Sequence, residues 1–268
     1  MKKLLIVLAG LMFFGSSCIK RCDPEIEGAD ARAVLKSTVK IYAKVSGHKR
    51  VFASDPSAVD GPKDFEPETI KWVGSGVVVR TDMKAEQSLI MSAAHVTNMI
   101  PPEAHREDGL HIFVAEKIEL TVETLDGTKC SAVQLAANKD TDVSVIRSNC
   151  VAGTAAEIAS ELPPIGSSVM VSGAALGFHP KNIFIITDGR YMGIDEDDGA
   201  EVVTLPAVSG HSGSGIFHEG KVVGIVSRRA VDFEHITLCV NLENIQKVFS
   251  LAEKVWALEK ANPNPARN

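Results

Sequence analysis

The sequence predicts an all-β protein that is built from two β-domains and closed by one α-helix. Short runs rich in Val, Ile and Thr, separated by turn-forming residues, occur in two sets along the chain. Such a series of short strands is typical of β-barrels and β-sandwiches. Near the C-terminus the apolar period changes from two residues to the 3.6 residues of a helix.

The two sets of strands define the domain boundaries. The first β-domain covers about 34–150 and the second about 165–240. The stretch between them, 151–166, has no strand alternation and contains a double proline, so we expect it to be the crossover. The last segment, 241–260, has helical spacing, and Asn241 is the expected N-cap.

The N-terminal segment has the pattern of an export signal followed by a tether. Residues 1–17 combine two lysines with a short apolar run and small residues, which is typical of a signal peptide and too short for a comfortable membrane span. Cys18 follows directly, so it is either the lipid-modified cysteine of a bacterial lipoprotein or the neighbour of an ordinary cleavage site. We expect a periplasmic or extracellular protein, free or anchored through a lipid on Cys18, with residues 18–33 as a polar linker.

Composition and charge limit the class of partner. With 45% hydrophobic and 23% charged residues among 268, the chain is expected to fold into a globular protein. The net charge of -6 becomes -8 when Lys2 and Lys3 leave with the signal peptide. A nucleic-acid-binding surface needs clustered basic residues, and the short cluster Lys20 and Arg21 falls in the linker, so nucleic acid is not expected as a partner.

The cysteines fit an oxidising compartment. Cys130 and Cys150 flank a segment with its midpoint at Asp140, so a β-hairpin turning at "NKD" would place the two opposite each other. They form either a disulfide or two buried thiols, since a cross-strand bridge must also meet tight geometry. The chain has neither a CxxC motif nor a His/Cys spacing typical of zinc, and we expect no metal site.

Three segments of the chain carry candidates for nucleophilic catalysis. The stretch "VSGHSGSG", residues 208–215, contains three serines, and a serine hydroxyl needs a base and a group that orients the base. His95 follows an apolar strand, beside two alanines that allow close approach, and Asp142 opens an alternating strand. Each signal taken alone is also compatible with a solvent-exposed histidine, a turn aspartate or a glycine-rich turn.

Together with their neighbours, these residues resemble a known family. The motifs occur in one order: "GSGVVV" (74–79), "SAAHV" (92–96), "TDVSVI" (141–146), "GHSGSG" (210–215) and "GKVVGIVS" (220–227). Over residues 34–258 this order resembles the trypsin-like serine peptidases, in particular the HtrA/Deg protease domain and the bacterial glutamyl endopeptidases. The resemblance implies two six-stranded antiparallel β-barrels with the active site between them, a polypeptide substrate and no metal or organic cofactor. A PDZ-like segment after 258 is not expected.

Carried over position by position, the resemblance assigns roles. Ser212 matches the nucleophile, His95 the general base and Asp142 the residue that orients the base. The backbone N–H groups of Gly210 and Ser212 match the donors of the oxyanion hole. His211 departs from the pattern, because digestive members carry aspartate there and HtrA-like members asparagine; activation by a newly freed N-terminus is therefore not implied.

The residues that match the substrate pocket of the family support more than one substrate preference. Pro206 and Ala207 stand where tryptic enzymes place an acid, which disfavours cleavage after Lys or Arg. Val226 replaces the histidine of glutamyl endopeptidases, so we expect a pocket for small or medium apolar side chains. Ser227, Arg228 and Arg229 continue this strand; the arginines either favour acidic substrate residues or are solvated charges at a sheet edge.

These patterns favour a secreted or membrane-tethered serine endopeptidase that acts through an acyl-enzyme. Two alternatives stay open: a catalytically silent binding protein on the peptidase scaffold, and an esterase that uses the same three side chains. A peptidase should gain rate from longer peptides, since remote binding energy can be used in the transition state.

Overall fold

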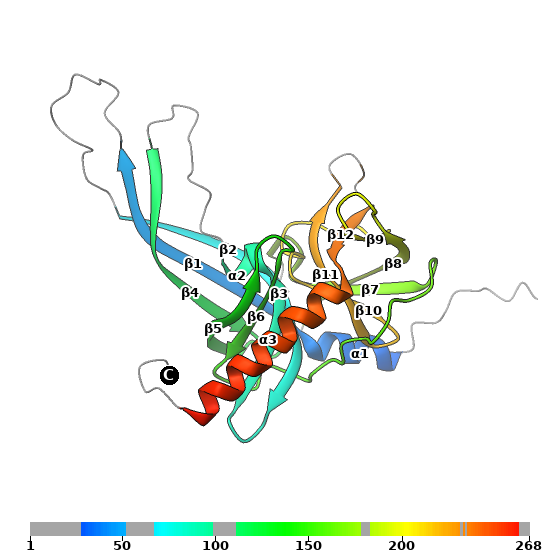
Figure 1. Ribbon diagram of the computed structural model, residues 1–268, viewed down its shortest axis with the longest axis horizontal. Helices are drawn as coiled ribbons and strands as arrows, with labels where there is room; N and C mark the ends of the chain where they lie inside the picture. The colour runs from blue at the N-terminus through cyan, green and yellow to red at the C-terminus, as the bar shows by residue number, and fades with distance from the viewer. Residues whose placement is uncertain are drawn as a thin grey trace, which may run out of the picture.

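Two closed, six-stranded antiparallel β-barrels make up the computed structural model (Figure 1). This confirms the expected fold, including the C-terminal helix. The strand order is β1-β2-β3-β6-β5-β4 in barrel one and β10-β11-β12-β9-β8-β7 in barrel two. The structure describes residues 28–51, 67–98, 111–177, 183–230, 233 and 235–262.

Barrel one holds its core between strands of high β-propensity. Its interior is lined by apolar side chains such as Ile41, Ile90 and Ile146, each fully buried. A short helix, α2 (Ala94–Thr97), follows the third strand. The strands are β1 (Thr38–Val51), β2 (Pro67–Asp82), β3 (Gln87–Ala93), β4 (His111–Glu123), β5 (Lys129–Asn138) and β6 (Val143–Ser148).

Barrel two repeats this arrangement with shorter strands. Val171, Leu205 and Ile216 are among the buried residues of its core. A 3₁₀ turn, η1 (Ala175–Gly177), follows the first strand. The strands are β7 (Ser168–Gly173), β8 (Ile185–Ile194), β9 (Glu201–Val203), β10 (Gly215–His218), β11 (Lys221–Arg229) and β12 (Thr237–Val240).

Helix α3 (Leu242–Ala261) crosses the two barrels (Figure 1). The side chain of Asn241 accepts a hydrogen bond from Asn244 N at 3.0 Å, which confirms the expected N-cap. The buried face, including Ile245 and Trp256, belongs to a core cluster with members in both barrels. Apolar packing of this helix therefore helps to fix one barrel against the other.

The linker expected over residues 18–33 ends earlier than the sequence indicated, because a helix begins at Gly28. Helix α1 (Gly28–Ser37) begins inside the range 18–33, because "ADARAVLK" contains good helix formers and Val34 is buried in the core cluster beneath α3. The signal peptide and Cys18 lie outside the described residues. Among the helices of the described residues, none has the length and hydropathy needed to cross a membrane.

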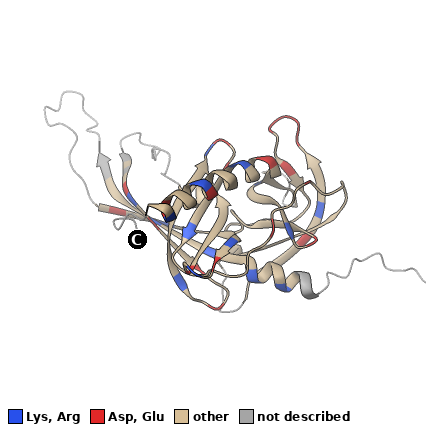
Figure 2. Ribbon diagram, turned by 60° about the horizontal axis from the view of Figure 1, so that its bottom comes forward, with Lys and Arg blue, Asp and Glu red and all other residues tan. Residues whose placement is uncertain are grey.

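Charged residues of both signs are interspersed over the ribbon of both barrels (Figure 2).

The crossover between the barrels runs beside β11, where Ala159 N donates to Val222 O at 2.9 Å and Val222 N donates to Glu157 O at 2.8 Å. The crossover thus contributes to barrel two instead of looping free.

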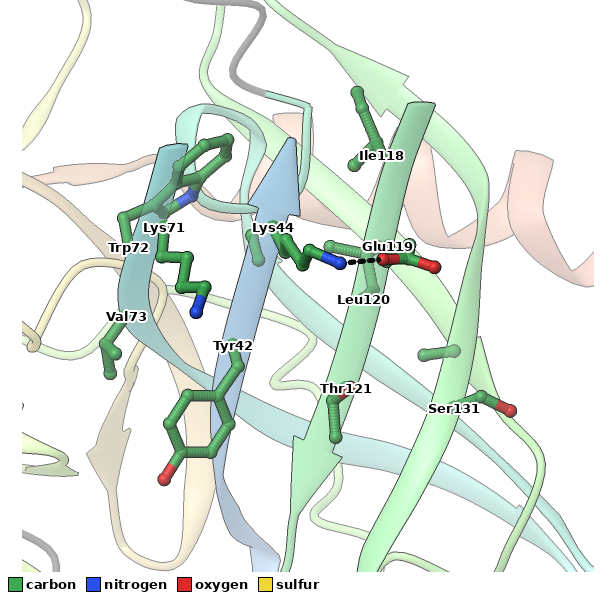
Figure 3. A pocket seen from close by; sticks show the side chains of 12 residues that line it. Tyr42, Lys44, Lys71, Trp72, Val73, Ile118, Glu119, Leu120, Thr121 and Ser131 are labelled. Atoms are coloured by element: carbon green, nitrogen blue, oxygen red, sulfur yellow. Dashed lines mark hydrogen bonds and ion pairs between the residues drawn. The ribbon is translucent and has the colours of Figure 1, made fainter. Parts of the chain in front are cut away.

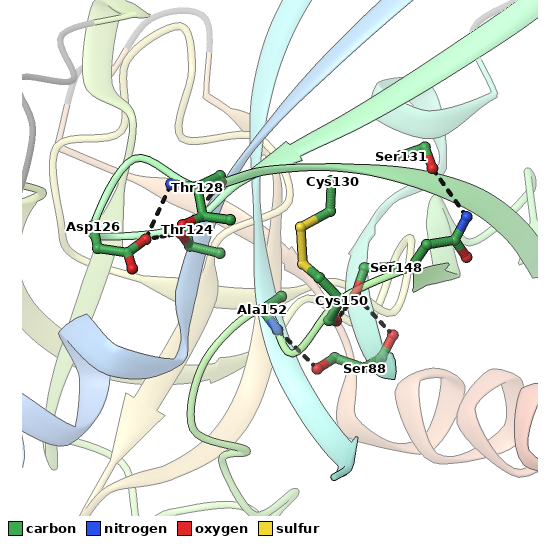
Figure 4. Close-up of a disulfide and its surroundings, with 10 residues drawn as sticks. Ser88, Thr124, Asp126, Thr128, Cys130, Ser131, Ser148, Cys150 and Ala152 are labelled. Atoms are coloured by element: carbon green, nitrogen blue, oxygen red, sulfur yellow. Dashed lines mark hydrogen bonds between the residues drawn. A yellow bond between two sulfur atoms is a disulfide. The ribbon is translucent and has the colours of Figure 1, made fainter. Parts of the chain in front are cut away.

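The disulfide between Cys130 and Cys150 is present (Figure 4). Cys130 lies in β5, Cys150 follows β6, and their Cα atoms are 6.0 Å apart. The hairpin between them turns at 139–142, close to the expected position. The bridge ties the end of this hairpin, where Asn149 N also donates to Ser131 O at 2.9 Å.

Replacing both bridged cysteines by serine is expected to lower the free energy of unfolding by about 3 kcal/mol, because the bridge closes a loop of 20 residues in the unfolded chain. Urea unfolding of the oxidised wild type and the double variant measures the difference. The reduced wild type is the control and should match the variant. Equal stability of the oxidised wild type and the variant would contradict this role.

Candidate active site

His95 and Asp142 are brought together by neighbouring strands. His95 lies in α2, directly after β3, and Asp142 lies in the turn before β6; Ala93 pairs with Val143 in the sheet. His95 Nδ1 is 2.8 Å from Asp142 Oδ2 and 3.0 Å from Oδ1, and His95 N donates to Oδ1 at 2.9 Å. A carboxylate only accepts hydrogen bonds, so the bond places the imidazole proton on Nδ1 and leaves Nε2 with a lone pair.

The carboxylate of Asp142 is held in a fixed position. The residue adopts φ 56°, a left-handed conformation that aspartate tolerates better than most residues. Ser227 Oγ donates to Asp142 Oδ2 at 2.5 Å. Burial opposes ionisation, but the hydrogen bonds from His95 and Ser227 outweigh it and hold the pKa of Asp142 below its usual value. Asp142 is therefore ionised at neutral pH, as an acceptor for an imidazolium must be.

Ser212 lies at the junction of the two barrels. Ser75 N, from barrel one, donates to Ser212 O at 2.8 Å, and Gly213 N donates to Val226 O of barrel two at 2.8 Å. A Cβ added at Gly213 would lie 3.0 Å from Ala93 N, two residues before His95. The loop that carries Ser212 therefore packs against the end of the strand that leads to His95. Among the described residues, no hydrogen bond joins Ser212 Oγ to His95; such bonds are often long before substrate binds.

The loop before Ser212 presents two backbone donors. Ser209 O accepts from Leu176 N at 2.6 Å, so the N–H of the same peptide, on Gly210, points the opposite way. Ser75 Oγ donates to Gly210 O at 2.7 Å and accepts from Ala174 N at 2.9 Å. Within the described part of the chain, the N–H groups of Gly210 and Ser212 have no acceptor, as donors to an oxyanion require.

Gly210 is required by its conformation. Its φ is +95°, and an added Cβ would lie 2.1 Å from Ala174 O. Gly210→Ala is expected to displace the N–H and lower kcat by about 10²- to 10³-fold, the typical loss of one oxyanion donor. Turnover of a peptide ester measures the loss. Gly166→Ala is the matched control, since Gly166 has φ +88° but open space around its Cβ position; equal losses in both variants would contradict the assignment.

His211, next to the candidate nucleophile, is a buried neutral imidazole. It is 1% exposed, and burial lowers its pKa. Its Nδ1 accepts from Val208 N at 3.3 Å, and its Nε2 has no hydrogen-bond partner in the described residues. A neutral ring carries no charge to attract a cationic N-terminus, so the absence of such an activation stays a prediction.

The predicted pocket residues occupy different environments. Pro206 is exposed and Ala207 buried on the segment that leads to Ser212. Val226 is buried in the core of barrel two, and the hydroxyl of Ser227 binds Asp142. The two arginines end β11: Arg228 forms an ion pair with Asp198, and Arg229 lies opposite Thr237 in the sheet.

Sequence reasoning missed two supporting serines. Ser75, fully buried in β2, was seen only as part of the motif "GSGVVV", although its backbone contacts Ser212 and its hydroxyl contacts Gly210. Ser227 was assigned to the substrate pocket, whereas its hydroxyl supports Asp142. A serine between two glycines, at the start of an apolar strand, was the available signal for Ser75; its partners are distant in sequence.

A hollow lies on barrel one, away from these residues. A cavity of about 750 Å³ is bordered by β1, β2 and β4, and the ion pair of Lys44 with Glu119, 2.9 Å long, crosses it (Figure 3). His95, Asp142 and Ser212 do not line it. The candidate active site is therefore defined by side-chain geometry and not by the size of this cavity.

Comparison with known proteins agrees with the two-barrel fold. Two similar solved structures are a serine endoprotease from Yersinia pestis (17% identity, TM-score 0.56, 84% of this chain and 65% of that one) and the Rv3671c protease from M. tuberculosis in its active form (18% identity, TM-score 0.55, 83% of each chain). This chain thus spans less than two thirds of the Yersinia protein, and at such identities the likeness shows the fold. A search of curated proteins found no match. The family described as "Trypsin-like peptidase domain" matches residues 74–225, more than half of the sequence, and the chain belongs to this family.

Proposed function

We propose that the protein is a serine endopeptidase in which Ser212 is the nucleophile. The observation that carries the proposal is the pair of contacts between the Asp142 carboxylate and Nδ1 of His95, at 2.8 and 3.0 Å. This arrangement leaves Nε2 as the basic atom, on a side chain that is 39% exposed between the barrels. Membership of the peptidase family supports a polypeptide substrate.

In the proposed reaction, His95 Nε2 takes the proton of Ser212 Oγ while Oγ bonds to the carbonyl carbon of the substrate. The resulting oxyanion accepts hydrogen bonds from Gly210 N and Ser212 N. His95 then returns the proton to the leaving amine as the C–N bond breaks, and an acyl-enzyme forms. Water, activated by the same imidazole, hydrolyses the ester, while Asp142 stabilises the imidazolium in both steps.

The end of β11 supports extended binding of the substrate. Ala230 N donates to Ile236 O at 3.0 Å, so the next pair, Arg229 opposite Thr237, is a non-hydrogen-bonded pair. The N–H and C=O of Arg229 therefore point to the other edge, where β10 pairs with β11 only as far as Ile225. A peptide can add there as an antiparallel strand.

Export is part of the proposal. The disulfide between Cys130 and Cys150 supports an oxidising compartment. Lipid attachment at Cys18 predicts that Cys18→Ala moves the protein from the membrane fraction to the soluble fraction of its host. A wild type that is found in the soluble fraction would contradict the lipid anchor at Cys18 and leave export alone.

A peptide-length series tests the function. Fluorogenic peptides of two to eight residues and a small acyl ester are offered to the wild type and to Ser212→Ala. An endopeptidase should show a kcat that rises with peptide length and is lost in the variant. Ester hydrolysis without a gain from length would favour the esterase, and no turnover of either substrate would favour a silent binding protein.

A further inference from the structure

Two adjacent arginines at the end of β11 have different surroundings. Arg228 forms an ion pair with Asp198 of the loop between β8 and β9. Arg229 has no hydrogen bond or ion pair with any described residue, although its side chain is exposed beside the candidate active site. Since Asp198 occupies only one of the two, the second guanidinium is available to a ligand.

The sheet register places these side chains on opposite faces. The pairing shifts between Val226 and Arg228, so that Arg228 lies opposite Leu238 and Arg229 opposite Thr237. Residues directly opposite each other in an antiparallel pair share a face. Thr237 is fully buried in barrel two, so Arg229 extends from the end of that inner face, whereas Arg228 lies on the outer face with Asp198.

The inner face adjoins the segment that leads to the candidate nucleophile. Thr237 Oγ1 donates to Leu205 O at 2.8 Å, which ties the strand carrying Thr237 to the start of segment 205–212. On the other side, Val226 N donates to Ser214 O at 2.9 Å, which ties the strand carrying Arg229 to the end of the nucleophile loop. Segments 205–209 and 227–229 therefore both adjoin the loop that carries Ser212.

A substrate side chain that enters beside Ser212, between these segments, would meet one charge and otherwise neutral groups. Ala207 and Thr237 are small and buried, and Val226 is apolar. Of the two charged residues in these segments, Arg229 is the one on the inner face, and a planar guanidinium binds a carboxylate through paired hydrogen bonds. Pro206, Ala207 and Val226 together predicted a small or medium apolar substrate residue; the position of Arg229 changes that expectation.

We propose that Arg229 is a specificity-determining residue that selects substrates with Asp or Glu at the residue contributing the scissile carbonyl. This inference rests on the proposed peptidase function and names its substrate class. The carboxylate would be bound from the end of β11, and not from position 226, where this chain has valine. Arg228 makes no such contact because Asp198 holds it on the outer face.

The test uses four peptides that differ only at the residue contributing the scissile carbonyl, which is Glu, Gln, Leu or Lys. Each peptide is offered to the wild type, Arg229→Gln and Arg228→Gln. The wild type is expected to show kcat/KM at least tenfold higher for Glu than for Gln, the order expected for a hydrogen bond to a charged group. Arg229→Gln should bring this ratio close to one. Arg228→Gln, the matched control, should keep the wild-type ratio, whatever it does to the absolute rates.

Binding of the same peptides to Ser212→Ala, with and without Arg229→Gln, separates the two hypotheses. Cleavage with a Glu/Gln ratio that Arg229→Gln does not change overturns the inference and leaves the peptidase. Absence of cleavage with an Arg229-dependent preference for Glu in binding overturns the peptidase and retains the acidic ligand. Absence of cleavage together with absence of an Arg229-dependent preference in binding overturns both the peptidase function and the inference.

Discussion

Ser212→Ala is expected to lower kcat by about 10⁶-fold, the loss seen when the nucleophile of a serine peptidase is removed. Adding His95→Ala should lower it little further, because the side chains act as one unit through the bond between His95 and Asp142. Asp142→Asn alone should cost about 10⁴-fold, since an amide in place of the carboxylate favours the wrong tautomer of the imidazole.

Steady-state hydrolysis of a fluorogenic peptide measures these losses, with circular dichroism to confirm folding. Ser214→Ala is the matched control, because the hydroxyl of Ser214 is buried in the same loop and has no hydrogen-bond partner among the described residues. A residual activity above about one hundredth in Ser212→Ala, or strictly multiplicative losses in the double variant, would argue against a single catalytic unit.

Glu201 is expected to make stability depend strongly on pH. This residue is 1% exposed in barrel two, and burial raises the pKa of its carboxyl to about 8, against the opposing hydrogen bond from Leu242 N at 2.6 Å. The folded pKa lies above the ordinary value of 4.5, so the stabilisation is present below about pH 4.5 and is lost as pH rises through 8. At about 1.4 kcal/mol per pH unit, the loss is on the order of 5 kcal/mol.

Glu201→Gln keeps an acceptor for Leu242 N and removes the titration. Urea unfolding at pH 5, 7 and 9 should show a falling free energy of unfolding in the wild type and a much flatter profile in the variant. Glu161→Gln, at an exposed position, is the control and should follow the wild type. Identical pH slopes in Glu201→Gln and the wild type would show that this carboxyl is not the source of the pH dependence of stability.

Local signals explain why much of the fold could be predicted. The period of the apolar residues and the N-cap of Asn241 are local, and α3 begins at the next residue. The facing positions of Cys130 and Cys150 followed from the length of one hairpin. Helix α1 was missed because its sequence is polar, and the burial of Val34 depends on core residues distant in sequence.

The site could be predicted in its residue types but not in its supporting contacts. His95, Asp142 and Ser212 stand in motifs that resemble a family; the structure joins His95 to Asp142 and packs the loop of Ser212 beside the strand that leads to His95. The different faces of Arg228 and Arg229 depend on one register shift in β11, which strand alternation does not reveal.

The most direct measurement is labelling of the folded, mature protein with a fluorophosphonate probe, which reacts with an activated serine hydroxyl and needs no knowledge of the substrate. Wild type, Ser212→Ala, His95→Ala and Ser214→Ala are compared at neutral pH. A nucleophile at Ser212 activated by His95 predicts labelling of the wild type and Ser214→Ala and none of the other two. A folded wild type that stays unlabelled, or a Ser212→Ala variant that is still labelled, would contradict it.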